Sequence, residues 1–157
     1  MLKTKSGKSI KSASDLQSVN ALKKEFERNK DLEVKVGFPA ESSDTISTEE
    51  GVTALFKATV NNYGLGVPKR PFMGVAFASN VGKYQKMIKK QLFKVPIAKI
   101  FAQIGSIGEG DVKRAIIAMK SPPNSAATIA RKGGDDNPLI DTGHMVGAVS
   151  HAVVKRA

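Results

Sequence analysis

The feature that most constrains the fold is the scarcity of strand patterns in this 157-residue sequence. Residues 32–38 (LEVKVGF) place an apolar side chain at every second position before Pro39, which predicts a half-buried strand. Residues 149–154 (VSHAVV) predict a second strand near the end of the sequence. Because an isolated pair of strands is marginal in water, either the chain contains further strands, expected first of all in residues 64–79, or neighbouring copies of the chain complete the sheet.

Two helices are predicted from their starting signals. Each begins with a capping box, a Ser followed three residues later by Gln or Glu, at residues 14–17 (SDLQ) and 47–50 (STEE). The second helix is expected to end at residues 61–64 (NNYG), where Gly permits the left-handed conformation of a helix stop. The apolar stripes expected to pack on the core are Leu16, Val19, Leu22 and Phe26 in the first helix, and Val52, Leu55, Phe56 and Val60 in the second.

The middle of the chain is predicted to be largely helical. Residues 81–92 carry apolar side chains at helical spacing with lysines on the opposite side, and Pro96 interrupts this pattern. Residues 97–120 continue a helical stripe through three glycines, which predicts one helix with a kink or thin packing, or two helices with a break. Residues 64–74 (GLGVPKRPFMG) predict a stiff, extended loop, and residues 125–131 predict one helical turn within a loop.

These patterns predict one α+β domain over residues 14–157, a small antiparallel sheet packed against two to four helices. A flexible basic arm is expected at residues 1–13. The chain has no cysteine, which excludes a disulfide scaffold, a thiolate metal site and a cysteine nucleophile. No apolar core follows the N-terminal lysines, so we expect no signal peptide, and no apolar run approaches the roughly 20 residues of a membrane-spanning helix.

The net charge of +11 is unevenly distributed. Residues 1–30 carry a net charge of +5, residues 31–50 of −5, residues 51–134 of +12 and residues 135–157 of −1. A basic surface of this kind is typical of a protein that binds nucleic acid. It is equally compatible with contact between the basic surface of one copy and the acidic surface of the next.

The run NPLIDTGHM (residues 137–145) contains the Asp-Thr-Gly of aspartic proteases. A protease half needs a flap, a long sheet and a second carboxylate, but only 14 residues follow Gly143. We therefore interpret Asp141 as a helix N-cap, with Ile140 and Met145 forming a hydrophobic staple and Pro138 stiffening the entry. Asp141→Ala is then expected to cost about 1 kcal/mol of stability.

Other candidate sites are interpreted as structural. Residues 133–136 (GGDD) resemble a polymerase motif but read as a polar turn, and the glycines of residues 105–110 do not follow a dinucleotide-binding strand. His144 and His151 have no third metal ligand in view, so no metal site is expected. The lysines of residues 83–90 are interpreted as a solvated helix face; the alternative, contact with nucleic acid, is disfavoured because aromatic residues are not interleaved with them as in proteins that bind single strands. No catalytic residue and no cofactor are predicted.

Two blocks of sequence, in order and separated by helices, resemble the tail-completion (neck, or head–tail joining) proteins of tailed bacteriophages. The first is VNNYG followed by VPKRPFM, and the second is SPPNSAATIARKG followed by NPLIDTGHMVGAVSHAV, so the resemblance covers roughly residues 50–154. In many relatives a polar or basic residue follows the helix start at Asp-Thr-Gly, where this chain has Val146, Gly147 and Ala148. The matching residues are Asn61, Gly64, Pro68, Arg70, Pro71, Phe72, Thr128, Ile129, Arg131, Lys132, Gly133, Pro138, Leu139, Asp141, Thr142 and Gly143.

The resemblance implies a structural protein of the virion without enzymatic activity. Such proteins form a ring, here expected to be a homo-hexamer, between the portal side of the head and the tail. The implied partners are copies of the chain and other neck and tail proteins. DNA would at most pass through the ring, without sequence-specific binding. The implied location is the head–tail junction of the virion, and the host cytoplasm during assembly.

The residues expected to matter for this function are of two kinds. Pro138, Asp141, Thr142 and Gly143 are expected to form a structural motif, and the candidate interface residues are Pro68, Arg70, Pro71, Phe72, Arg131 and Lys132. The main alternative function is a small basic nucleic-acid-binding protein. A tail terminator, a minor capsid component and a homodimeric aspartic protease remain further alternatives.

Overall fold

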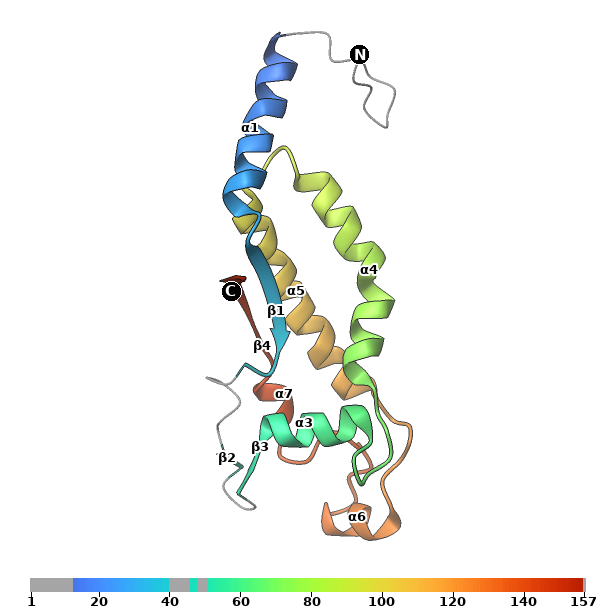
Figure 1. Ribbon diagram of the computed structural model, residues 1–157. Coiled ribbons are helices and arrows are strands. Elements are labelled where there is room, and N and C mark those ends of the chain that lie inside the picture. Colours follow the sequence, from blue (N-terminus) through green and yellow to red (C-terminus); the bar gives the residue numbers. More distant parts are fainter. Residues whose placement is uncertain (1–12, 40–45, 48–50, 157) are drawn as a thin grey trace.

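The computed structural model describes residues 13–39, 46–47 and 51–156, so most of the predicted N-terminal arm lies outside the described residues. The fold is α+β, as predicted (Figure 1). The helices are α1 (Ala13–Asn29), α3 (Ala54–Tyr63), α4 (Phe72–Gln91), α5 (Ile97–Ala118), α6 (Ala126–Arg131) and α7 (His144–Gly147). The strands are β1 (Leu32–Gly37), β2 (Ile46–Ser47), β3 (Val52–Thr53) and β4 (Ser150–Lys155). None of the helices in the described part of the chain is long and apolar enough to cross a membrane.

The main sheet consists of the two strands that the sequence predicts. β1 and β4 pair antiparallel, with Val34 opposite Val153. Residues 64–79, the first expected location of further strands, contain none; they form a loop and the first turns of α4, so this expected location is wrong. The other two strands, β2 and β3, pair only with each other over two residues.

Helix α5 packs against the sheet and runs without a break through the three glycines, which decides between the two predicted alternatives. Two of them, Gly105 and Gly108, allow the helix to approach the sheet closely. A Cβ at Gly105 would lie 2.4 Å from Cδ2 of His151 and 3.2 Å from Cγ1 of Val34, and one at Gly108 would lie 3.3 Å from Cγ2 of Val36. The missing side chains therefore set the distance between α5 and both strands.

The hydrophobic core lies between the sheet, α4 and α5 and extends to the C-terminal segment. Its fully buried members include Phe72 at the start of α4 and Ile116 on α5. The ring of Phe38, just after β1, meets the ring of Phe72 edge to face with centroids 6.3 Å apart. Leu139 and Met145, which lie on either side of the Asp-Thr-Gly sequence, belong to the same cluster.

Helix α1 differs from the prediction at both its start and its apolar face. It includes Ala13, so Ser14 lies inside the first turn instead of at the N-cap. Its apolar stripe does not pack on the core: Leu16 is 53% and Phe26 47% exposed. The helix is held at its other end, where Oε1 of Glu25 accepts a hydrogen bond from the backbone N–H of Ile97 at 2.6 Å and so caps α5.

Helix α3 begins later than predicted. Ser47 belongs to β2, and Thr53 is the N-cap, with its hydroxyl accepting from the N–H of Phe56 at 3.1 Å. The predicted capping box is therefore wrong, although the predicted stop at Gly64 is confirmed by its left-handed conformation. The buried face consists of small residues, Ala54 and Ala58, and Phe56 is 58% exposed.

A buried carboxylate joins α4 to α5. Asp111 on α5 is 3% exposed. Its oxygens accept hydrogen bonds from Lys83 Nζ at 2.6 Å, from the Tyr84 hydroxyl at 2.6 Å and from the Arg114 guanidinium. Burial opposes ionisation of Asp111, but these three donors together outweigh it and lower its pKa. Burial, followed by the Asp111 contact, raises the pKa of Tyr84.

We expect stability to fall in acid because of this cluster. The folded-state pKa of Asp111 lies below its ordinary value of 3.8, so its contribution is present above that value and is lost as the pH falls through the lower pKa. Asp111→Asn should cost roughly 2 kcal/mol at pH 7, less than a fully buried pair because Lys83 and Arg114 can regain water. The variant should also show a shallower loss of stability between about pH 5 and pH 2. Urea unfolding across that range measures both effects, and parallel wild-type and variant curves would contradict them.

Candidate functional site: a cleft between the two motif blocks

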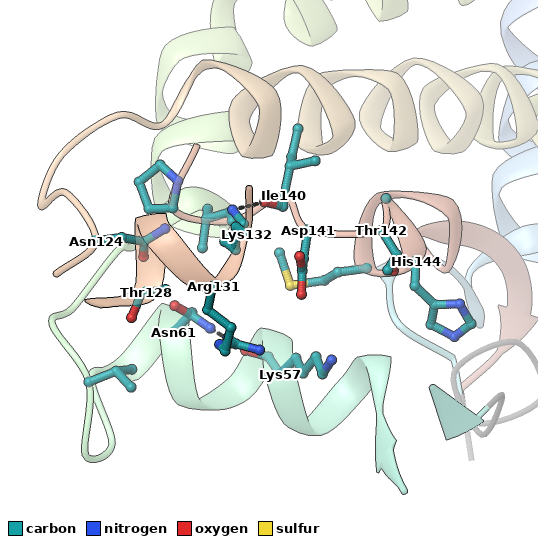
Figure 2. A pocket seen from close by; sticks show the side chains of 15 residues that line it. Lys57, Asn61, Asn124, Thr128, Arg131, Lys132, Ile140, Asp141, Thr142 and His144 are labelled. Carbon is teal, nitrogen blue, oxygen red and sulfur yellow. Dashed lines mark hydrogen bonds between the residues drawn. The ribbon is translucent and has the colours of Figure 1, made fainter. Parts of the chain in front are cut away.

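The two motif blocks meet at one end of the molecule, around a cleft of about 320 Å³. Helix α3 forms one side of the cleft, and α6 with the loop leading to α7 forms the other (Figure 2). The described lining residues are Lys57, Asn61, Val67, Asn124, Thr128, Arg131, Lys132, Met145 and the segment 138–144. The cleft thus brings together residues from both blocks that the sequence separates by some 60 positions.

Arg70 joins the two blocks from the inside. Its side chain is buried, and its guanidinium donates to the carbonyl oxygens of Pro122 at 2.8 Å and Pro123 at 3.1 Å. It also donates to the Oδ1 atoms of Asn61 at 2.8 Å and Asn124 at 3.4 Å. Burial lowers the pKa of Arg70, but a guanidinium stays protonated in proteins, so the neutral oxygens hold a buried cation.

Lys132 and Asn137 hold the second block together. The Lys132 ammonium donates to the carbonyl oxygen of Asn137 at 2.6 Å and to that of Ile140. The buried side chain of Asn137 donates to the carbonyl oxygen of Ile117 at 3.1 Å and accepts from the N–H of Leu139 at 3.2 Å. These bonds fasten the loop after α6 to the end of α5.

The remaining polar side chains of the second block border the open cleft. Ser125 is the N-cap of α6, with its Oγ accepting from the N–H of Thr128 at 3.2 Å, so the helical turn predicted here is confirmed. Arg131 reaches from α6 toward α3, where Lys57 and Asn61 lie (Figure 2). Asp141 is the only carboxylate among the described lining residues.

The structure corrects the predicted role of Asp141. Helix α7 begins at His144, and its N-cap is Gly143 in the left-handed conformation (φ 78°), with no side-chain capping hydrogen bond. The helix therefore starts two residues later than an Asp141 cap requires. The apolar part of the predicted staple has a counterpart, because Ile140 and Met145 both pack in the core cluster.

We now expect Asp141→Ala to change the free energy of unfolding by less than about 0.5 kcal/mol, as is usual for an exposed residue that caps no helix. Ser125→Ala is the matched comparison in the same block. It removes a cap and should cost about 1 kcal/mol. Chemical denaturation of the two variants measures both values. A decrease of about 1 kcal/mol or more in the free energy of unfolding of Asp141→Ala would instead support a capping role for Asp141.

The candidate interface residues occupy different environments. Arg70 and Phe72 are 3% and 0% exposed, so the structure places their side chains in the interior rather than on a contact surface. Lys132 is half-buried and bonded to carbonyl oxygens. Pro68, Pro71 and Arg131 are exposed, and their role at an interface stays a prediction. Sequence reasoning missed Asn137, whose buried amide has no local pattern to reveal it.

The histidines lie apart in the fold. His144 borders the cleft, whereas Nδ1 of His151 on β4 lies 2.6 Å from Oε2 of Glu109 on α5. Hydrogen bonds from Lys113 and then His151 lower the pKa of Glu109. Within the described ranges, no three potential ligands of the His, Cys, Asp and Glu types lie close enough together to hold a metal ion.

Comparison with known proteins gives no match, since no protein family, curated protein or solved structure is significantly similar to the chain.

Proposed function

We propose that this chain is a structural protein of a tailed-phage virion, a neck or tail-completion subunit whose ring joins the head to the tail. The observation that carries the proposal is the joining of the two motif blocks by Arg70. Residues of both blocks that resemble this family form one hydrogen-bonded unit instead of being scattered over the fold. Their polar groups hold backbone segments in place, as expected for residues with a structural rather than a catalytic role.

The exposed apolar side chains support an assembly subunit. Beside the cleft, the outer face of α3 and the following loop present Leu55, Phe56, Tyr63 and Leu65, each more than 40% exposed. Large exposed apolar patches are typical of surfaces that another protein covers. The exposed Pro68 and Pro71 follow these residues in the sequence, so we assign the contact between ring subunits or with a neck partner to this region.

The alternative is a nucleic-acid-binding protein, which the net charge of +11 favours. It would bind duplex DNA with an affinity that falls steeply with salt, in proportion to the phosphates neutralised. A neck subunit should bind DNA only weakly and without sequence preference. Lys83, one of the lysines on α4, is already bonded to Asp111, which leaves fewer cations on that face for phosphates.

The proposal is tested by negative-stain electron microscopy of lysates from a phage that lacks this gene. We expect filled heads beside separate tails, and complete virions after complementation with the wild type or with Asp141→Asn. Normal virions without the gene would refute the joining function and favour the nucleic-acid alternative. Failure of a folded Asp141→Asn protein to complement would mean that the function requires the Asp141 carboxylate in the cleft.

A further inference from the structure

Helix α1 leaves its apolar side without a partner in the described fold. The helix extends beyond the turn between α4 and α5, away from the rest of the molecule (Figure 1). Every residue from 14 to 21 is exposed, and the contact with α5 is made near the other end by Glu25. Leu16, Val19 and Phe26 lie on one side of the helix, 53%, 39% and 47% exposed. Helices in proteins gain most of their stability from packing of their apolar face, which this helix lacks in the described fold.

We propose that this side of α1 is a dimerisation surface on which α1 of a second copy packs antiparallel. The argument for a second copy is that the stripe is complementary to itself. In an antiparallel pair centred between residues 22 and 23, the small Val19 lies opposite the large Phe26 of the other copy, and this contact occurs twice. A two-fold interface requires this kind of self-complementarity.

The charges at the ends of the stripe agree with this register. Asp15 lies in the first turn of α1, on the side of the stripe, and Lys30 directly follows Asn29, the last residue of the helix. The antiparallel arrangement therefore sets the Asp15 carboxylate of each copy against the Lys30 ammonium of the other. A parallel arrangement would set like charges together at both ends. Lys23 lies at the centre, where its long stem can cover apolar surface while its ammonium reaches water.

The proposed dimer does not depend on the joining function. It would add a two-fold contact between copies of the chain. Such a contact cannot occur between neighbours in a simple six-fold ring, because it relates the two copies by a two-fold axis. It therefore fits a dimer formed before docking, or a contact between two rings.

The chain has no cysteine, so single introduced cysteines give an unambiguous test. Lys23→Cys places a thiol beside the proposed two-fold axis, and Lys24→Cys, its neighbour on the far side of the helix, is the matched control. Under mild oxidation of the full-length proteins, we expect a disulfide-linked dimer from Lys23→Cys and little from Lys24→Cys. Equal cross-linking of both variants, or of neither, would overturn the proposal.

Sedimentation equilibrium supplies the second measurement. Val19→Asp should weaken dimerisation at least about tenfold, since it places two charges in the apolar contact. Asn20→Asp, the adjacent exposed position on another side, should leave it unchanged. Circular dichroism serves to confirm that both variants fold. A wild-type chain that stays monomeric at about 100 μM, or a Val19→Asp chain that dimerises like the wild type, would overturn the proposal whatever the outcome of the lysate experiment.

Discussion

Arg70→Ala is expected to lower the free energy of unfolding by about 3 kcal/mol. The substitution removes the hydrogen bonds from the Arg70 guanidinium to Pro122, Pro123 and Asn124. It leaves the part-buried carbonyl oxygens of Pro122 and Pro123 without their Arg70 donor, and a polar group left unsatisfied on burial costs about 1–3 kcal/mol. Urea denaturation followed by circular dichroism measures the loss.

Two comparisons separate this structural role from a role in binding. Lys69→Ala changes the neighbouring exposed cation and should alter stability by less than about 0.5 kcal/mol. Arg70→Lys keeps the charge but loses the planar fork, so its stability should fall between those of Arg70→Ala and the wild type. An Arg70→Ala protein as stable as the wild type, but unable to assemble, would show that Arg70 acts at an interface after all.

Gly105→Val is expected to cost about 3 kcal/mol, because even a Cβ at this position would lie 2.4 Å from the His151 ring. The added side chain must push β4 away from α5 or displace the ring from Glu109. Either change opens the packing between the helix and the sheet. Thermal unfolding should show the loss as a lower midpoint.

Gly110→Val is the matched control on the same helix. A Cβ at Gly110 would meet only the flexible end of Arg114, at 3.4 Å. Since Val is also the better helix former, the free energy of unfolding should change by less than about 0.5 kcal/mol. Similar losses for the two variants would mean that helix flexibility, rather than the close approach to the sheet, explains the glycine at position 105.

Much of the fold could be predicted because its signals are local. The alternation of residues 32–38 and the glycine at position 64 each report a preference of a few adjacent residues. The packed face of α3 could not be predicted in the same way. Periodicity favours large side chains such as Phe56, but the face that is buried carries Ala54 and Ala58.

The candidate site was harder to predict because its contacts are long-range. Nothing near Arg70 in the sequence indicates that its guanidinium would be buried against carbonyl oxygens more than 50 residues away. The Asp-Thr-Gly sequence suggested a cap at Asp141, but a glycine that adopts positive φ can itself begin a helix, and Gly143 does so. Some of the residues that carry the resemblance, such as Asn61 and Asp141, line the cleft, but the resemblance did not indicate that Arg70 and Phe72 lie in the interior.

The proposed location of the protein is tested most directly by immunogold labelling of purified virions with an antibody raised against the full-length chain. The account predicts gold particles at the junction between head and tail, on most virions and at no other place. Virions without label, while the lysate contains the protein, would contradict a structural role in the particle. Label confined to the capsid shell or the tail tip would contradict the joining function.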